Sequence, residues 1–185
     1  MKKISKNYLA IFILACILVS CEKEEESSVP LVYGCTSETA MNYVSGANTD
    51  DGSCIYAHEI AQGTWNINPD CEEYTIPVIA TTISLNDQLP PTVDVQAGDG
   101  NILYIDINDS QIEGSIDNSG NIIVQKQTVS IGDMGFGPMD VDVEGSGVIT
   151  SPTNGNMNLT YTFEIETIPL FPITESLDCS IGLTK

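Results

Sequence analysis

Six cysteines are the residues of this chain whose type and spacing most readily suggest chemistry. Four of them lie well beyond the apolar N-terminal segment: Cys35, Cys54, Cys71 and Cys179. An even number of cysteines predicts disulfides in a chain that is exported. A zinc site is the alternative, but no pair has the C-x-x-C spacing, and His58 is the only histidine in the sequence.

The N-terminus indicates export. Three lysines within the first six residues precede an apolar run over residues 8–18, and a small residue, Ser20, precedes Cys21. This pattern is typical of a signal peptide that is removed from the mature protein. The run is shorter than the roughly 20 apolar residues that span a membrane. We therefore expect residues 1–20 to form a cleaved signal peptide helix.

The stretch Leu18-Val19-Ser20-Cys21 resembles the lipobox of bacterial lipoproteins. In that family the cysteine thiol receives a diacylglycerol, the peptide bond before the cysteine is cut, and the new amine is acylated with a fatty acid such as palmitate. The resemblance implies that Cys21 is the first mature residue and carries the lipid. Acyl chains contribute about 0.8 kcal/mol per buried methylene, so several chains together anchor a protein stably.

The charge of the mature chain limits its partners. Cleavage after residue 20 leaves Lys23, Lys126 and Lys185 against 26 acids, a formal charge of −23. Such a chain cannot neutralise phosphates, which excludes nucleic acid, and it cannot dock electrostatically on an anionic membrane. The lipid on Cys21 is then the membrane anchor. The acidic surface also favours a soluble, monomeric domain.

Residues 21–33 are expected to be a lipidated, flexible tether, because residues 22–28 are charged or polar. Lys23-Glu24-Glu25 resembles an export signal of Bacteroidota surface lipoproteins, in which a lysine and acids follow the lipidated cysteine. That resemblance implies an outer-membrane protein that faces the cell exterior. A plain solvated spacer has the same composition, so both interpretations stay open.

Residues 34–56 are bracketed by cysteines. The positions that carry a resemblance are Gly34-Cys35-Thr36, Ala40, Asn42-Tyr43, Ala47 and Asp50-Asp51-Gly52-Ser53-Cys54. They are similar to a short repeat of secreted and surface proteins of the same bacterial group, and to the calcium-binding repeats of thrombospondins. A unit this small needs a disulfide or a metal to fold. We favour the pairs Cys35–Cys54 and Cys71–Cys179, because each then lies within one apparent unit.

This repeat also contains a candidate calcium site, and we expect no other cofactor. Asn48, Asp50 and Asp51 supply several oxygens within one turn, and calcium binds six to eight oxygens. The acid that would close an EF-hand loop is missing. The same Asp-Asp-Gly-Ser sequence also forms a turn by hydrogen bonding to its own backbone, so a plain turn is the alternative.

After a linker at 57–62, residues 63–185 alternate short apolar runs with turns rich in Gly, Asn, Asp and Pro, which predicts an all-β domain. The expected strands are 63–68, 73–85, 92–96, 102–107, 111–116, 122–131, 139–150, 157–167 and 176–183, with hairpin turns at 118–121 and 153–156. No stretch has a helical period. Nine closely spaced strands predict an antiparallel meander, closed as a barrel or folded as an immunoglobulin-like sandwich.

Gly63-Thr64-Trp65 opens the first expected strand and resembles the Gly-x-Trp at the start of lipocalins, where the tryptophan plugs the closed end of the barrel. The layout extends the resemblance, because a cysteine follows soon after, then a run of hairpins and a last strand that starts near Cys179. The resemblance implies a lipocalin-like barrel. In such a barrel a Cys71–Cys179 bond would hold the first and last strands together.

Alternation along the strands assigns their two faces. The residues expected to point inward are Ile105, Ile123, Val143, Tyr161 and Phe163. Asp140, Asp142 and Glu144 share one face of their strand, which we expect to be solvated, since an antiparallel sheet commonly has one wet side. A ladder of acids that binds cations is the alternative for these three residues.

No pattern in the sequence indicates an enzyme. His58 is expected to be an exposed linker residue, and there is no nucleophile elbow, Walker loop or two-histidine metal motif. We expect a non-catalytic structural or binding module with a protein or glycan partner, and a lipocalin-type carrier of a small apolar ligand is the alternative. The inward residues are mostly bulky, and side chains can fill an eight-stranded barrel, which favours the module.

The glycine-rich segment 132–139 is the best candidate for a binding surface. It would present Met134, Phe136 and Met139, and exposed apolar loops often bind partners. The alternative is a loop that folds over one end of the barrel.

Overall fold

The computed structural model describes residues 29–76, 80–107, 110–131, 139–165 and 173–185. The expected signal peptide, the lipidation residue Cys21, and the loop residues Met134 and Phe136 lie outside these ranges. The chain divides into two compact units, residues 1–31 and residues 32–185. In the second unit nearly all regular structure is β-strand, which confirms the all-β prediction.

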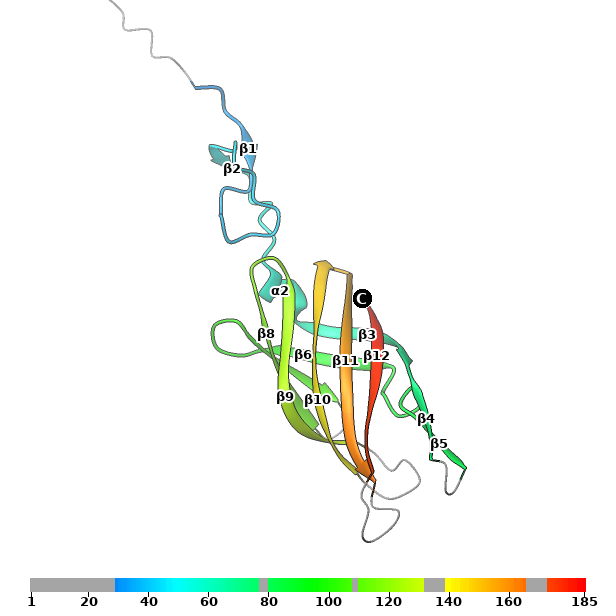
Figure 1. Ribbon diagram of the computed structural model, residues 1–185. Coiled ribbons are helices and arrows are strands. Elements are labelled where there is room, and N and C mark those ends of the chain that lie inside the picture. Colours follow the sequence, from blue (N-terminus) through cyan, green and yellow to red (C-terminus); the bar gives the residue numbers. More distant parts are fainter. Residues whose placement is uncertain (1–28, 77–79, 108–109, 132–138, 166–172) are drawn as a thin grey trace, which may run out of the picture. The chain divides into compact units, whose positions relative to one another are not determined.

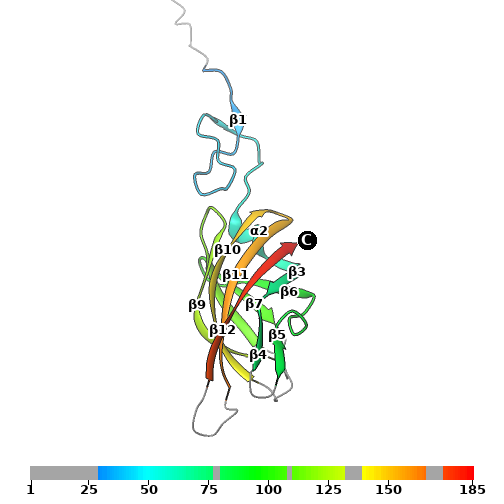
Figure 2. The same ribbon diagram turned by 45° about the vertical axis from the view of Figure 1, so that its right-hand side comes forward.

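Eight strands form a closed barrel, seen in Figure 1. They are β3 (Gly63–Cys71), β6 (Thr92–Ala97), β7 (Ile102–Ile107), β8 (Ser110–Ile116), β9 (Asn121–Ile131), β10 (Met139–Ser151), β11 (Asn154–Ile165) and β12 (Ile173–Thr184). Each strand pairs antiparallel with the next, and β12 pairs with β3 to close the ring. Figure 2 shows the strands curving around one interior. This closed meander confirms the lipocalin-like barrel over the immunoglobulin-like sandwich.

One expected strand, 73–85, is wrong. The structure has two strands there, β4 (Glu73–Ile76) and β5 (Thr81–Ser84), which pair with each other as a separate antiparallel hairpin. The hairpin is held by its apolar side chains, because Ile76 and Ile83 are at most 1 % exposed and belong to the same core as the barrel. The hairpin is therefore an insertion between the first two strands of the barrel.

The cysteine-bracketed repeat contains two very short strands, β1 (Tyr33–Gly34) and β2 (Thr49–Asp50), which pair in parallel. A disulfide joins Cys35 to Cys54, as predicted. The segment expected to be a linker contains a helix, α2 (Ala57–Ala61), whose five residues are too few to show a helical period in the sequence. No helix in the described ranges combines the length and the apolar character that crossing a membrane requires.

Strict alternation predicts strand faces correctly. Val143 on β10 is completely buried, and Tyr161 and Phe163 on β11 are at most 2 % exposed, as expected. Ile105 is partly buried and packs against the same core. The side chains of Asp140 and its alternate neighbours face outward, so the solvated face of β10 is confirmed.

The inward placement of Ile123 is wrong. This side chain is 49 % exposed, whereas its neighbours Ile122 and Val124 are 4 % and 2 % exposed. Three consecutive apolar residues contain no alternation, so the sequence does not define the phase of the strand. The register with β10 then shifts, because two residues of β9, Gln125 and Lys126, oppose a single residue of β10 as a β-bulge.

The two expected hairpin turns have different outcomes. The turn near 118–121 is confirmed, and Gly120 takes a φ of +88°, a left-handed conformation that glycine adopts without strain. The turn at 153–156 is placed too late. Ser151 pairs with Asn154, so residues 152–153 make the turn, and the Asn-Gly dipeptide that suggested it lies inside β11.

Candidate functional site

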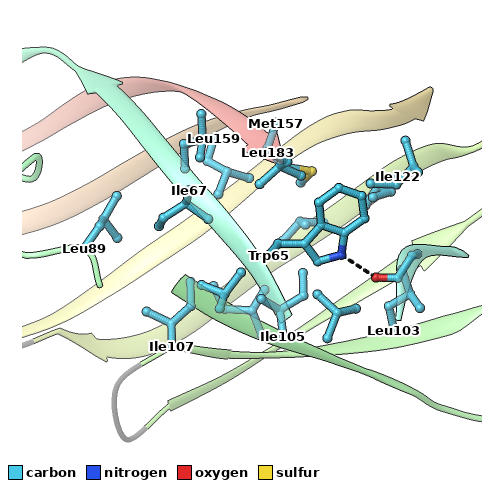
Figure 3. A pocket seen from close by; sticks show the side chains of 17 residues that line it. Trp65, Ile67, Leu89, Leu103, Ile105, Ile107, Ile122, Met157, Leu159 and Leu183 are labelled. Carbon is cyan, nitrogen blue, oxygen red and sulfur yellow. Dashed lines mark hydrogen bonds between the residues drawn. The ribbon is translucent and has the colours of Figure 1, made fainter. Parts of the chain in front are cut away.

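The helix α2 and the tryptophan of the Gly-x-Trp motif close one end of the barrel. Trp65 is 1 % exposed, and its indole nitrogen donates a hydrogen bond to the carbonyl oxygen of Ala61 at 2.7 Å. Figure 3 shows the indole lying inside the barrel with this bond. Gly63 joins the helix to β3 with a φ of +100°, which only glycine adopts readily. Trp65 therefore plugs this end, as the resemblance to lipocalins implies.

Lys185 completes the closed end. Its ammonium group lies 4.4 Å from the centroid of the Trp65 ring, and it donates hydrogen bonds to the carbonyl oxygens of Ile60 and Gln62. A cation–π contact contributes roughly 0.5–1 kcal/mol at such a site. Partial burial lowers the pKa of Lys185. Sequence reasoning missed this role, because a lysine at the last position has no spacing that links it to a tryptophan.

A disulfide fastens the first strand of the barrel to the last. Cys71 and Cys179 lie directly opposite each other in the ladder between β3 and β12, and they are bonded, as predicted. The two cysteines are 108 residues apart in the sequence. In the chain-entropy model, closing a loop of about 100 residues stabilises the fold by up to about 4.7 kcal/mol.

The interior of the barrel is nearly filled. The cavity that remains has a volume of about 50 Å³, whereas small-molecule pockets measure about 300–1,000 Å³. All of its lining residues are apolar. Figure 3 shows Leu89 on the opposite side of this cavity from Trp65. Leu89 comes from the connection between β5 and β6, so the interior is filled from both ends.

Another interior cavity, of about 10 Å³, lies beside Tyr161, and Leu89, Ile107 and Ile112 line both interior cavities. Tyr161 is 1 % exposed, and its hydroxyl has no hydrogen-bond partner among the described residues. A buried polar group in this condition destabilises a fold by roughly 1–3 kcal/mol. The same burial raises the pKa of Tyr161 to about 12. Such a group cannot be recognised from sequence, where it reads as one more inward aromatic residue.

The barrel wall is least regular between β8 and β9. In the described part of these strands, only two residue pairs, next to the hairpin turn, join them as a ladder. Farther along, the side-chain amide of Gln127 accepts a hydrogen bond from the backbone nitrogen of Glu113 at 2.8 Å and donates one to its carbonyl oxygen at 2.7 Å. The Ser110 hydroxyl bonds the backbone of Ser130 in the same way, at 3.0 and 3.1 Å. Hydrogen bonds from side chains thus take the place of backbone hydrogen bonds between β8 and β9.

A polar network covers the outer face beside this seam. Lys126 forms an ion pair with Asp142 at 3.1 Å, and the Thr128 hydroxyl donates a hydrogen bond to the same carboxylate at 2.7 Å. The hydrogen bond from Thr128 and the ammonium of Lys126 together lower the pKa of Asp142. Asp142 therefore has protein partners on an otherwise solvated strand face.

The candidate calcium ligands lie in a turn stabilised by its own hydrogen bonds. Asp50 accepts a hydrogen bond from the backbone nitrogen of Gly52, and Asp51 accepts one from that of Ser53, both at 3.0 Å. The hydrogen bonds from Ser53 lower the pKa of Asp51. The side-chain oxygen of Asn48 accepts a hydrogen bond from the backbone nitrogen of Val32, just before the repeat, at 2.9 Å. These contacts support the turn, and calcium binding stays a prediction.

Two other residues lie in places that the sequence did not suggest. His58 was expected to be exposed, but it is half-buried, and its ring Nε2 donates a hydrogen bond to the carbonyl oxygen of Ile102 at 3.0 Å. Met139, a candidate binding residue, is partly buried and packs against the barrel core.

Comparison of the chain with models of protein families, with curated proteins and with solved structures found no match. Function is therefore inferred from the residues and the geometry of the chain itself.

Proposed function

We propose that the mature protein is a lipid-anchored, non-catalytic module whose barrel is a rigid scaffold that binds a protein or a glycan at its outer surface. The observation that carries the proposal is the filled interior. The cavity of about 50 Å³ is too small for the ligands of a typical carrier, whose pockets measure several hundred Å³. Trp65 and Leu89 lie on opposite sides of this cavity (Figure 3).

The lipid anchor is inferred from the Leu18–Cys21 sequence. Two disulfides support an exported location, because such bonds form and persist in oxidising compartments. Lys23-Glu24-Glu25 favours the outer membrane, with the barrel facing the cell exterior. The carrier of a small apolar ligand remains the second candidate, because the residual cavity is entirely apolar.

Probes of two sizes test the filled interior. A naphthylamine dye, which needs a pocket of carrier size, is expected not to bind the mature chain. The variant Leu89→Ala enlarges both interior cavities, because this side chain lines each of them, and we expect it to bind benzene, as an engineered apolar cavity of about 150 Å³ does. The variant Ile123→Ala, on the outer surface, is the matched control and should bind neither probe. Saturable binding of the dye that survives Ile123→Ala and the replacement of the exposed Val32 and Val44 by serine would overturn the proposal and establish the carrier.

The intact mass of the protein extracted from bacterial membranes tests the anchor. We expect a chain that begins at Cys21 and carries a diacylglycerol and an amide-linked acyl chain. Cys21→Ser should lose the added mass and leave the membrane fraction. Recovery of the wild-type chain without lipid would contradict the proposed anchor.

A further inference from the structure

Large apolar side chains are exposed mainly near the start of the described chain. Those exposed among the described residues are Val29, Leu31, Val32, Tyr33, Tyr43, Val44 and Ile123. All but Ile123 precede residue 45, and the other large apolar residues of the barrel whose burial the structure describes are buried or half-buried. Clustered exposed apolar residues mark a surface that contacts a partner or a membrane.

Four of these residues belong to the cysteine-bracketed repeat or to the residues directly before it in the second unit. Val32, Tyr33, Tyr43 and Val44, here called the apolar patch, are 43 %, 62 %, 40 % and 43 % exposed. Four large apolar side chains are thus at least 40 % exposed within a short segment, where burial would normally be favoured. The patch therefore requires an explanation other than chance.

Backbone hydrogen bonds hold the two halves of the apolar patch side by side. The nitrogen of Val44 donates to the carbonyl oxygen of Cys35 at 2.9 Å, and the carbonyl oxygen of Val32 accepts from Asn48 at 2.9 Å. The Val44 side chain lies against Gly34, where an added Cβ would come within 3.2 Å of it. The Cys35–Cys54 disulfide cross-links the same segment. The patch is therefore preformed, and little conformational entropy is lost when it binds.

We propose that the apolar patch rests on the lipid surface in which Cys21 is anchored, as a second membrane contact. This inference depends on the proposed lipid at Cys21. Eleven residues lead from Cys21 to Val32, and an extended chain spans at most about 3.6 Å per residue, so the patch stays within about 40 Å of the anchored cysteine. A short tether of this kind raises the effective concentration of the lipid surface at the patch.

The residue types and the charge of the repeat agree with an uncharged lipid surface. Tyrosines are enriched where a protein meets the membrane–water interface, because one end of the ring is apolar and the other is polar. The repeat also carries Glu38, Asp50 and Asp51 and has no lysine or arginine. It would be repelled by an anionic surface, so the contact is apolar and not electrostatic.

Footprinting of the tyrosine rings tests this contact. The lipidated protein, its lipid verified by intact mass, is reconstituted in phosphatidylcholine vesicles and exposed to hydroxyl radicals. Labelling of Tyr33 and Tyr43 is expected to fall at least fivefold relative to the unlipidated Cys21→Ser chain in solution. Labelling of Ile123, on the barrel, should be the same in both samples. The intact mass reports the anchor and the footprint reports the patch, so failure of one is distinct from failure of the other.

A double variant tests whether the apolar residues cause the protection of the tyrosines from labelling. Val32→Ser combined with Val44→Ser should restore the labelling of Tyr43 to within twofold of the solution level, whereas Ile123→Ser, which removes an exposed apolar residue elsewhere, should leave the protection intact. Equal labelling of the two tyrosines with and without the membrane would overturn the proposal. Protection that appears only in phosphatidylglycerol vesicles would also overturn it, because that result requires an electrostatic contact.

Discussion

Replacing Tyr161 with phenylalanine should stabilise the barrel. The ring is 1 % exposed, and its hydroxyl is buried without a hydrogen-bond partner among the described residues. Burying such a group costs roughly 1–3 kcal/mol, and phenylalanine keeps the ring while it removes the cost. We expect the free energy of unfolding to rise by about 1–2 kcal/mol near neutral pH. Most substitutions in a packed core lower the free energy of unfolding instead.

The same residue predicts how stability depends on alkaline pH. Burial raises the pKa of Tyr161 to about 12 in the folded state, from 10.0 for an unperturbed tyrosine. Above pH 10 the unfolded chain therefore ionises while the folded chain keeps its proton, so folding loses stability as pH rises. The loss approaches about 1.4 kcal/mol per pH unit between pH 10 and pH 12 and totals about 2.3 kcal/mol at pH 12. Tyr161→Phe lacks this contribution.

Urea unfolding at pH 7 and pH 11 measures both effects. Tyr161→Phe should exceed the wild type at pH 7, and its advantage should widen by about 1 kcal/mol at pH 11. Tyr104→Phe, which removes a hydroxyl from a half-buried ring on the outer face of β7, is the control. A variant that is less stable than the wild type by more than about 1 kcal/mol at pH 7 would refute the reasoning, because the hydroxyl must then have a partner.

Three further changes test other parts of the fold. Gln127→Ala should lower stability by about 1–2 kcal/mol and speed hydrogen exchange of the Glu113 amide, because it removes both hydrogen bonds from this side chain to the Glu113 backbone. Gln125→Ala, the control, should have neither effect. Unchanged exchange in Gln127→Ala would contradict the role of these hydrogen bonds in joining β8 to β9. Gly120→Ala should destabilise by about 2 kcal/mol or more in thermal unfolding, because its φ is +88° and a Cβ would lie 2.3 Å from a carbonyl oxygen of β10. Gly100→Ala, with open space around it, should cost only about 1 kcal/mol, and equal losses would contradict the steric argument. Serine in place of both cysteines that join β3 to β12 should lower stability by up to about 4.7 kcal/mol in urea.

The sequence predicts the fold well wherever local patterns are unambiguous. Val141 and Val143 alternate with acids, so their inward placement follows directly from the two-residue period of a strand. Ile123 was misplaced because Ile122 and Val124 are also apolar, and either phase fits the sequence. Its exposure results from the register of β9, which long-range pairing decides.

The missed hairpin has a similar cause. Residues 77–80 read Pro-Val-Ile-Ala, in which Pro77 is the single residue typical of turns and the rest continues the apolar pattern. Ala80 nevertheless takes a φ of +50°. A left-handed alanine is disfavoured locally, so the packed core around Ile76 and Ile83 must impose this turn.

Only part of the candidate site could likewise be predicted from the sequence. Trp65 could be predicted from a three-residue motif, and the two disulfides from the number and layout of the cysteines. Lys185 could not, because its contact with the carbonyl oxygen of Ile60 joins residues 125 positions apart. The Gln127 rung and the unpaired Tyr161 hydroxyl are likewise properties of the assembled barrel and have no local signature.

Native mass spectrometry of residues 22–185, secreted by an oxidising host, tests the filled scaffold most directly. The account predicts a mass four hydrogens below that of the reduced chain, for the two disulfides, and no retained small molecule. A chain that retains an apolar molecule of several hundred daltons would contradict the account, because the interior cavity of about 50 Å³ could not hold it.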